Sequence, residues 1–360
     1  MSHRVPMARA ARHAGYDVHV IAHVDKDGAA IEALGFRLHP MEWRRGSISP
    51  LAFCGNIRGV RRLYRTIAPD IVHHVALQPT IVGSLAASGL PFVRLNAVAG
   101  LGFVFISGTL MARFARPVFR ALLRYVLGNE HASVLVQNSD DRTAIKSLGI
   151  ADGHIFTIPG SGVETDKLTP LPEPSGPITI AFVGRLLDDK GVRTLVNAHA
   201  ILARRGQPVR LLIAGEPDPA NPVSIPPEEI MDWSRRPGIE VLGHVTDICE
   251  VWKAAHIAVL PSRREGLPKS LLEAAACGRP IVATDVPGCR EIAREGVNAL
   301  LVPPDDAQAL ADAISRLADD KDLRRKFGEA SRRLAESEYS AERVGADIVA
   351  LYDRLLGRRR

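Results

Sequence analysis

Short apolar runs alternate with longer segments of helical periodicity along the second half of the chain. Continuous apolar runs joined by helices are typical of parallel strands that are buried on both faces of a sheet. The pattern therefore predicts a doubly wound α/β domain, with further helices from about Ala307. The runs predicted to form its strands are 178–184, 209–215, 239–243, 257–261, 280–284 and 298–304.

The first half repeats this alternation less regularly and predicts a second Rossmann-like domain. Residues 159–177 between the halves are rich in Pro and Gly without sustained periodicity, which is typical of a linker. We expect one domain over 1–162, a second over 163–340, and a terminal helix within 341–360 that can pack back on the first domain. The strands expected in the first half are 18–22, 70–75, 91–96 and 133–138.

The composition is that of a soluble globular chain. Of its 360 residues, 46% are hydrophobic and 24% are charged, which is enough apolar material for two cores. Arg4, Arg9 and Arg12 interrupt the start, so we expect no signal peptide. The four cysteines lack the spacing of a metal site and are expected to be reduced thiols. These features predict a cytoplasmic protein.

Positive charge is concentrated in the first half. Residues 1–162 hold 18 Lys and Arg against 10 Asp and Glu, whereas the remainder holds 28 against 30. Four arginines share one face of the helix predicted over 111–126, and apolar residues occupy the rest. Such a helix can lie in an anionic membrane interface or pack as an ordinary surface helix, and both interpretations stay open. The four are Arg113, Arg116, Arg120 and Arg124.

Two cations follow the strand predicted over 178–184. They are Arg185 and Lys190, and a predicted helix comes next. Ligands bind at the carboxyl end of strands in a doubly wound sheet. Fixed positive charge there can stabilise a departing diphosphate without a metal ion. The ordinary alternative is a basic loop that is merely solvated.

A second candidate segment follows the fourth strand of this half. Glu265-Gly266-Leu267-Pro268 leads into a predicted helix that contains Glu273. Proline suits a first helical turn, and the N–H groups of a helix start suit a diphosphate, with Gly266 permitting close approach. Each carboxylate can accept hydrogen bonds from sugar hydroxyls. Alternatively, Glu265 stabilises the helix start electrostatically and Glu273 pairs with a surface cation.

Together these segments resemble the donor domain of the family 4 GT-B glycosyltransferases. The family motifs occur in order and with ordinary spacing. The resemblance implies two Rossmann-like domains that face a cleft, a nucleotide-diphosphate sugar as donor, and no metal or other cofactor. The matching residues are Gly184, Arg185, Lys190 and Gly191, then Gly243 to Asp247, then Glu265, Gly266, Leu267, Pro268 and Glu273.

The resemblance also implies a role for each motif. Arg185 and Lys190 would hold the donor diphosphate, Glu273 would bind the ribose, and Glu265 would contact the transferred sugar. The backbone from Gly243 to Asp247 would meet the base. Transfer would retain the anomeric configuration, with Glu265, Arg185 and Lys190 as the catalytic residues and the other matched residues binding the donor.

Other phosphate-binding chemistry is disfavoured. A dehydrogenase would carry G-x-G-x-x-G after a strand, and neither this fingerprint nor a P-loop occurs in the sequence. Asp25-Lys26-Asp27 has the D-x-D form of metal-dependent transferases, but aspartates beside glycine are more often turn formers. We expect no metal site and no nucleic-acid partner.

The first half resembles, more weakly, bacterial family members that extend glycans on polyprenyl-diphosphate carriers. The similar segments include PDIVHHVALQP and NAVAGLGFVF. His73 and His74 end a predicted strand, where one could contact a phosphate or acceptor oxygen and the other would be structural, since neighbouring strand residues point to opposite faces. Many members place a histidine where this chain has Ala97 to Gly100, so no general base is assigned.

The chain starts with a helix-like segment from Arg4 to His13 and then the strand 18–22. A doubly wound domain normally opens with a strand that pairs centrally, and its loss would remove ladder hydrogen bonds from both neighbours. We therefore expect the natural protein to carry about 10–20 more residues before Met1, the length of a strand plus a loop. The alternative is that another segment fills the gap.

As a whole, the sequence predicts a transferase at the inner face of the cytoplasmic membrane. It would move a hexose or N-acetylhexosamine from a nucleotide-diphosphate sugar, with UDP favoured, to a lipid-linked glycan in cell-surface polysaccharide or glycoconjugate synthesis. The alternatives are a GT-B sugar-nucleotide epimerase and a non-catalytic sugar-nucleotide-binding protein. An NAD oxidoreductase is a more distant one.

Overall fold

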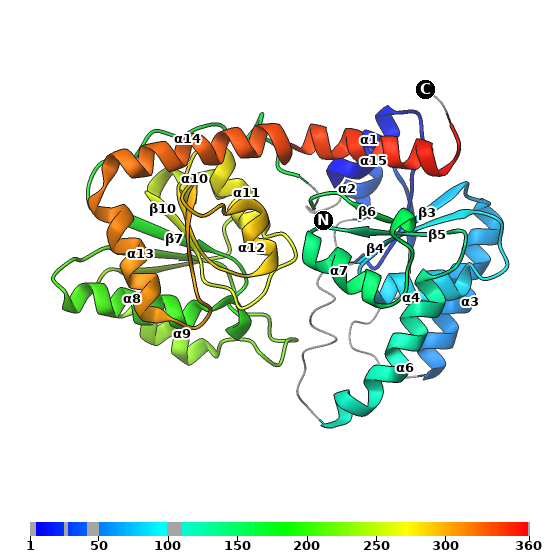
Figure 1. The fold of residues 1–360 in the computed structure, drawn as a ribbon, viewed down its shortest axis with the longest axis horizontal. Helices are drawn as coiled ribbons and strands as arrows, with labels where there is room; N and C mark the ends of the chain where they lie inside the picture. Colours follow the sequence, from blue (N-terminus) through cyan, green and yellow to red (C-terminus); the bar gives the residue numbers. More distant parts are fainter. Residues whose placement is uncertain (1–4, 25–27, 42–49, 99–109, 161, 359–360) are drawn as a thin grey trace. The chain divides into compact units, whose positions relative to one another are not determined.

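The computed structural model describes residues 5–24, 28–41, 50–98, 110–160 and 162–358. The chain divides into two compact units (Figure 1). Unit 1 comprises Met1–Ser161 with Val344–Arg360, and unit 2 comprises Gly162–Arg343. Both are α/β units whose neighbouring strands pair in parallel.

Unit 2 is built on a six-stranded parallel sheet in the order β12-β11-β10-β7-β8-β9. Most strand residues are buried, which explains why their sequences are continuous apolar runs. Each strand lies inside the run predicted for it, so the six predicted strands are confirmed. They are β7 (Thr179–Val183), β8 (Arg210–Ala214), β9 (Ile239–Gly243), β10 (Ile257–Leu260), β11 (Ile281–Thr284) and β12 (Ala299–Val302).

Helices connect the strands of unit 2, and several begin at a capping side chain. Asp247, Asp306 and Asp320 each accept a hydrogen bond from a backbone N–H of the first turn of α10, α13 and α14. The helices are η2 (Asp188–Lys190), α8 (Val192–Arg204), α9 (Pro227–Ser234), α10 (Ile248–Ala254), α11 (Lys269–Ala276), α12 (Pro287–Ile292), α13 (Ala307–Asp319) and α14 (Lys321–Glu338).

Unit 1 holds a four-stranded parallel sheet in the order β3-β4-β5-β6 and a separate pair, β1-β2. The four predicted strands are confirmed as β1, β3, β4 and β5, whereas β2 and β6 were not predicted. The strands are β1 (His19–Ala22), β2 (Arg37–Pro40), β3 (Ile71–Val75), β4 (Val93–Ala97), β5 (Ala132–Val136) and β6 (Ile155–Thr157). The helices are α1 (Val5–His13), α2 (Gly28–Ala33), α3 (Pro50–Ile67), α4 (Leu77–Ala86), α6 (Leu110–Leu127), α7 (Ser139–Ser147), η1 (Asp152–His154) and α15 (Ala341–Leu355).

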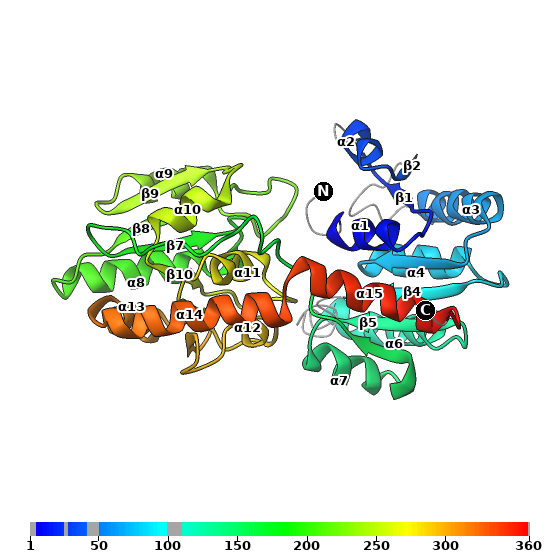
Figure 2. The same cartoon turned by 90° about the horizontal axis from the view of Figure 1, so that it is seen from above.

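The terminal helix α15 and the first helix α1 lie side by side against the four-stranded sheet (Figure 2). Met7 and Ala11 of α1 share an apolar cluster with Val344 and Ile348 of α15 and with Leu95 of β4. The chain after Val344 thus belongs to the core of unit 1 rather than to that of unit 2.

The two sheets of unit 1 are separate in the described residues. In the part of the chain that the structure describes, β1 pairs with β2 and β3 pairs with β4, and no ladder connects β1 to β3. Ile21 of β1 nevertheless packs against the apolar cluster that contains Val72 of β3. Asp25 to Asp27, which carry the D-x-D pattern, lie outside the described residues. The expectation of further residues before Met1 stays a prediction.

Candidate active site

The strand order of unit 2 contains a switch point between β7 and β10. From β7 the chain continues to β8 and β9 on one side, and from β10 to β11 and β12 on the other. In such sheets, ligands bind beside the carboxyl ends of the two strands at the switch point. The loops that leave these strands carry Arg185 with Lys190 and Glu265 with Gly266, so both candidate segments lie at this point.

The two loops pack directly on each other. The backbone N–H of Arg263 donates to the carbonyl of Asp189 at 2.9 Å. Gly191 lies so close to the carbonyl of Pro261 that a Cβ at this position would be 2.0 Å from its oxygen. Gly191 also has φ of +70°, a backbone conformation that only glycine adopts without cost. The sequence alone does not reveal this contact.

Lys190 and Glu265 are joined by an ion pair at the centre of this contact. Lys190 Nζ donates to Glu265 Oε1 at 2.6 Å, and the buried Ser262 donates its Oγ–H to the same oxygen at 2.7 Å. Only 21% of the lysine side chain and 9% of the glutamate side chain are exposed. The Glu265 carboxylate is therefore held by two side chains, in addition to lying before the start of α11.

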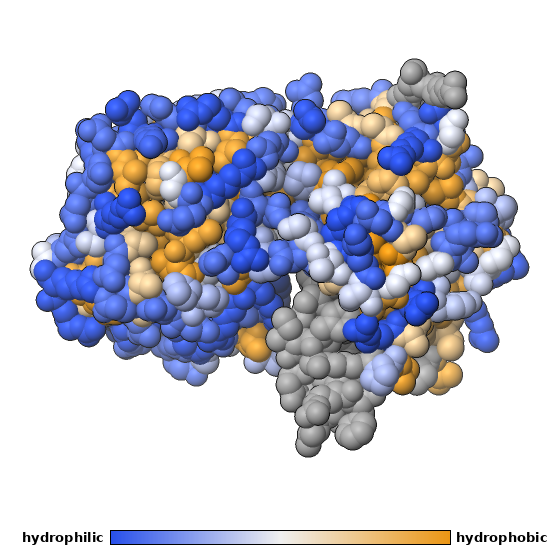
Figure 3. All heavy atoms as spheres, in the orientation of Figure 1, coloured by the Kyte–Doolittle hydropathy of each residue, from blue (hydrophilic) through white to orange (hydrophobic). Residues whose placement is uncertain are grey.

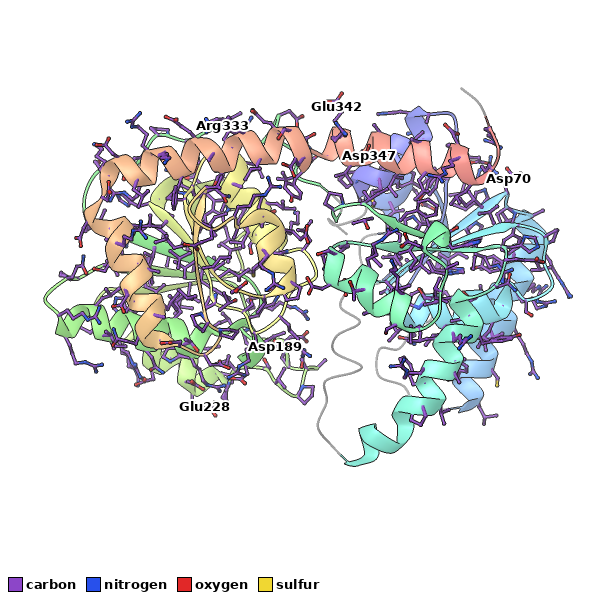
Figure 4. The ribbon with its side chains drawn as sticks, viewed as in Figure 1. Asp70, Asp189, Glu228, Arg333, Glu342 and Asp347 are labelled. Atoms are coloured by element: carbon purple, nitrogen blue, oxygen red, sulfur yellow. The ribbon has the colours of Figure 1, made fainter. Side chains whose placement is uncertain are left out.

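Arginines beside Glu265 tie the same loops together. Arg263 donates from Nε to both carboxylate oxygens of Asp305, at 2.7 and 2.9 Å, and from Nη1 to Asp188. Arg264 donates to Asp189, which is labelled in Figure 4, at 2.8 Å. Single exposed ion pairs stabilise little, but several charges joined in one network fix positions more firmly. These pairs hold the loop of Glu265 against the loop of Lys190.

Arg185 lies at a pocket of about 390 Å³ on the same edge of the sheet. Its Nη1 donates to Asp218 Oδ2 at 2.9 Å, and Asp218 belongs to the loop that follows β8. The volume is within the range of small-ligand sites. The pocket is lined by Val183, Gly184, Arg185, Ala214, Gly215, Glu216, Pro217, Asp218, Pro219, His244, Val245 and Ile248.

The sequence did not indicate that the loop after β8 belongs to the candidate site. This loop is bonded along its length to the loop of Arg185, since Leu186 N–H donates to the Glu216 carbonyl at 2.9 Å and Ile225 N–H donates to the Leu186 carbonyl at 2.9 Å. A cluster of Gly, Pro and Asp immediately after a buried strand was the available signal, because ligand-binding loops leave parallel strands at that end.

The segment from Gly243 to Asp247 contributes to the pocket through its middle. His244 and Val245 line it, and Gly243 has φ of +64° at the end of β9. The Asp247 carboxylate instead accepts the N–H of Cys249 at 2.9 Å and caps α10. The side chain of Asp247 therefore has a structural role, whereas contact of the backbone with a base stays a prediction.

Glu273 lies in the second turn of α11 and is 8% exposed. Burial raises the pKa of its carboxyl group, and the ammonium group of Lys269, 2.8 Å away, acts in the opposite direction. The cation pairing weighed as an alternative from the sequence is thus present. Pro268 is the N-cap of α11 rather than its first helical residue, and Leu267 packs partly buried against the core of unit 2.

The two histidines of β3 point to opposite faces of the sheet. His74 is buried; its Nε2 accepts from the Tyr64 hydroxyl and its Nδ1 donates to Asn96 Oδ1, both at 2.8 Å. It also lies against Gly83, where a Cβ would be 2.3 Å from Nε2. His74 is therefore the structural member of the pair, and we no longer assign it as a candidate acceptor contact. His73 Nδ1 is hydrogen bonded to the hydroxyl of Tyr352 at 2.7 Å.

The burial of His74 predicts a pH-dependent loss of stability. Burial lowers the pKa of His74 from 6.5 to about 4, so the unfolded chain binds this proton more readily than the folded chain. The stability that the folded protein gains from keeping His74 neutral is therefore complete above pH 6.5 and is lost as the pH falls toward 4. Between pH 7.5 and 5, we expect the free energy of unfolding to fall about 2 kcal/mol further in the wild type than in His74→Gln. Urea titrations at both pH values measure this difference, and equal losses would contradict it.

The described residues contain neither a candidate metal cluster nor a membrane-spanning helix. No group of three or more His, Cys, Asp or Glu in the described part of the chain could hold a metal ion. Likewise, none of the described helices is long and apolar enough to cross a membrane.

Two family models match the chain, one in each half. The model described as glycosyl transferases group 1 matches residues 177–320, and glycosyl transferase 4-like matches residues 1–138. An N,N'-diacetylbacillosaminyl-diphospho-undecaprenol alpha-1,3-N-acetylgalactosaminyltransferase of Campylobacter jejuni is 26% identical over 98% of this chain and 95% of its own length. The capsular polysaccharide biosynthesis glycosyltransferase CapM of Staphylococcus aureus is 24% identical over 82% of this chain and 79% of its own.

Solved structures share the fold over nearly the whole chain. Sucrose-phosphate synthase from Thermosynechococcus elongatus matches with a TM-score of 0.82 at 22% identity, covering 98% of this chain and 92% of that one. Anabaena HepE in complex with UDP matches with a TM-score of 0.78 at 17% identity, covering 98% and 96%. At these identities the likeness establishes the fold.

The fold is that of the GT-B glycosyltransferases, with two Rossmann-like domains. The site at the switch point of unit 2 lies within the segment that the group 1 model matches. The chain belongs to the group 1, or family 4, glycosyltransferases and is a hexosyltransferase that uses a nucleotide sugar.

Proposed function

We propose that this enzyme transfers a hexose or N-acetylhexosamine from a UDP-sugar to a lipid-linked glycan, with retention of the anomeric configuration. The observation that carries the proposal is the packing of the Lys190 loop against the Glu265 loop at the switch point of unit 2. It places a cation and a carboxylate 2.6 Å apart at the edge where such sheets bind ligands.

The pocket beside Arg185 is suited to the nucleotide end of the donor. The base would lie against the His244 to Ile248 segment, and Arg185 would turn from Asp218 toward the diphosphate. Glu273, whose partner Lys269 remains 31% exposed and can move, would accept the ribose hydroxyls. These roles are assigned by the family resemblance and are compatible with the contacts of each side chain.

The chemistry requires charge stabilisation more than proton transfer at this edge. The bond from the sugar C1 to the diphosphate oxygen breaks, and a new bond forms from C1 to the acceptor hydroxyl oxygen on the same face. The proton of the acceptor hydroxyl would pass to the departing diphosphate oxygen. Arg185 and Lys190 would stabilise the negative charge that develops on the departing diphosphate. Glu265 would accept hydroxyl hydrogen bonds from the sugar while Lys190 and Ser262 hold its carboxylate.

The lipid-linked acceptor is proposed from the relatives. The Campylobacter jejuni relative carries a diphospho-undecaprenol substrate in its name and is similar over 98% of this chain. The Staphylococcus aureus relative is named for capsular polysaccharide synthesis. The first name favours an acceptor linked to a diphosphate lipid, and the second favours a role in capsular polysaccharide synthesis.

A panel of nucleotide sugars tests the proposal. UDP- and GDP-linked hexoses and N-acetylhexosamines are incubated with the enzyme, with and without undecaprenyl-diphosphate glycans, and the products are followed by mass spectrometry. We expect one UDP-sugar to be consumed and its sugar to appear on the lipid-linked acceptor. Conversion of the UDP-sugar to an epimer or free sugar at the same rate without any acceptor would indicate an epimerase instead.

Substitution of the two glutamates is expected to affect different kinetic quantities. Glu273→Gln should mainly weaken nucleotide binding, because a ribose contact present in both ground and transition states acts on affinity. Glu265→Gln should mainly lower kcat. Calorimetry with UDP and steady-state kinetics measure the two effects, and unchanged UDP affinity in Glu273→Gln would remove its ribose assignment.

A further inference from the structure

Asp218 holds Arg185 in the pocket of unit 2. Arg185 Nη1 donates to Asp218 Oδ2 at 2.9 Å, and this carboxylate is the only acceptor that the described residues offer to the guanidinium group. Both residues line the pocket of about 390 Å³. In the proposed function Arg185 stabilises the departing diphosphate, so Asp218 binds the same group that the diphosphate would need.

The backbone on either side of Asp218 is fixed by its own segment, residues 216–226, here called the Asp218 loop. The N–H of Asp218 donates to Ser224 Oγ at 2.9 Å, and its carbonyl accepts the N–H of Asn221 at 2.8 Å. Pro217 and Pro219 flank Asp218 in the sequence, and each proline fixes its own φ. The Asp218 carboxylate is therefore attached to a backbone with little freedom to move.

The Asp218 loop is also fastened to the loop of Arg185 and to the core. Ser224 forms an antiparallel bridge with Leu187, and the Asp188 N–H donates to the Val223 carbonyl at 2.8 Å. Ile225 is 1% exposed and belongs to the apolar core of unit 2. Hydrophilic residues dominate the surface around α9, into which the loop leads (Figure 3). The loop thus has firm attachments at its far end, away from the pocket.

The arginine is the movable member of this ion pair. Its side chain is 58% exposed, against 28% for that of Asp218, and it is the longer of the two. An exposed ion pair contributes little free energy, so it can be broken by a stronger partner. A diphosphate is such a partner for a guanidinium group, because it carries more negative charge and can accept two parallel hydrogen bonds.

We propose that Asp218 competes with the diphosphate for Arg185 and thereby lowers the affinity of the site for the nucleoside diphosphate product. The inference rests on the proposed contact of Arg185 with the diphosphate. While the nucleotide is bound, the Asp218 carboxylate would lie at the pocket wall without its cation and near a second anion. After transfer, the return of Arg185 to Asp218 offsets the contact that Arg185 loses, so the product leaves faster. Product release limits turnover in many enzymes.

Calorimetry with the full chain tests the proposal. UDP, GDP and ADP are each titrated into the wild type, and the nucleotide that binds most tightly is then used with the variants. Asp218→Asn should bind it about five- to tenfold more tightly, the size expected for loss of an exposed ion pair and of repulsion between two anions. Unchanged binding would overturn the proposal. Weaker binding would also overturn it, by showing that Asp218 orients Arg185 for the ligand.

A double variant shows whether the gain depends on Arg185. In the Arg185→Ala background, Asp218→Asn should bring no gain in affinity, because no cation is left to release. A gain that persists there would reflect repulsion between anions alone and would overturn the proposal. Failure of the proposed function has a separate signature, since Arg185→Ala alone would then leave the affinity for the nucleotide unchanged.

Glu216→Gln provides the charge-matched comparison. Glu216 is exposed and lines the same pocket, so this variant removes one negative charge from the pocket without releasing Arg185. Asp218→Asn should therefore raise the affinity more than Glu216→Gln does. Equal gains in the two variants would assign the effect to net charge and overturn the proposal.

The rate of nucleotide release gives a second measurement. Differences in affinity between related complexes lie mostly in the dissociation rate. A fluorescent derivative of the same nucleotide, displaced by an excess of the unlabelled one, should therefore leave Asp218→Asn about five- to tenfold more slowly than the wild type. Release at the wild-type rate would contradict a role of Asp218 in product departure.

Discussion

Replacing Lys190 by alanine is expected to reduce turnover of the donor sugar nucleotide by about 100-fold or more. Lys190 extends from the loop after β7 to within 2.6 Å of the Glu265 carboxylate, at the edge proposed to receive the diphosphate. A preorganised cation there stabilises the charge that develops on the leaving group. Arg185→Ala should cause a loss of similar order. The rate of nucleotide release at a saturating concentration of the donor measures turnover in both variants.

A double variant distinguishes two explanations for such a loss. Lys190 could act on the donor diphosphate, or it could only neutralise Glu265, whose side chain is 9% exposed. A buried carboxylate deprived of its cation is strongly unfavourable. If neutralisation were the whole effect, Lys190→Ala combined with Glu265→Gln would turn over as fast as Glu265→Gln alone. We expect the double variant to be much slower, and equal rates would contradict the diphosphate assignment.

Arg205→Ala provides the matched control. Arg205 is 39% exposed and pairs with Asp312 in unit 2, so its removal deletes a cation and an ion pair without touching the loops of the site. We expect its turnover to equal that of the wild type. The same assay in EDTA tests the expectation of a metal-free reaction, because activity lost in EDTA and restored by manganese would overturn it.

The strands of unit 2 could be predicted because burial on both faces leaves a continuous apolar signature. All four residues of β10, Ile257–Leu260, are buried, and the sequence there is uninterrupted. The missed strands lack this signature. β2, Arg37–Pro40, is exposed at both ends and contains a charged and a polar residue, whereas β6 has three residues. Short, half-exposed strands are held by their neighbours rather than by their own composition.

The residues of the candidate site could be proposed from the sequence, but their partners in the structure could not. Gly184, Arg185, Lys190, Glu265, Gly266 and Glu273 could be named because each belongs to a short motif of fixed spacing. The contact of Lys190 with Glu265 spans 75 positions and that of Arg185 with Asp218 spans 33, so no local pattern records them. The same holds for His74, whose partners Tyr64 and Asn96 come from a helix and a different strand.

Gly191→Ala is expected to affect both stability and turnover, because Gly191 joins the two loops of the site. Its φ of +70° costs a non-glycine residue about 1–2 kcal/mol. In addition, a Cβ would lie 2.0 Å from the Pro261 carbonyl oxygen, so the loop after β10 must move. Such overpacking costs a further 1–3 kcal/mol or so. Displacement of the Glu265 loop by about 1 Å would lower turnover on the order of 100-fold.

Gly206→Ala separates the backbone effect from the contact. Gly191 precedes helix α8 and Gly206 follows it, and their φ values of +70° and +73° are nearly equal. Nothing lies within 4 Å of a Cβ built at Gly206, so this variant carries the same backbone strain without the clash. We expect Gly206→Ala to lower the melting temperature while leaving kcat close to that of the wild type.

The difference between the two variants isolates what the contact of Gly191 with Pro261 contributes. If the contact sets the distance from Lys190 to Glu265, kcat should fall in Gly191→Ala while calorimetry finds the affinity for UDP little changed, since the pocket that Arg185 lines is formed largely by other loops. Equal kcat in the two alanine variants would mean that the loops keep their spacing without this contact. The ion pairs of Arg263 with Asp188 and Asp305 would then be the element that positions Glu265.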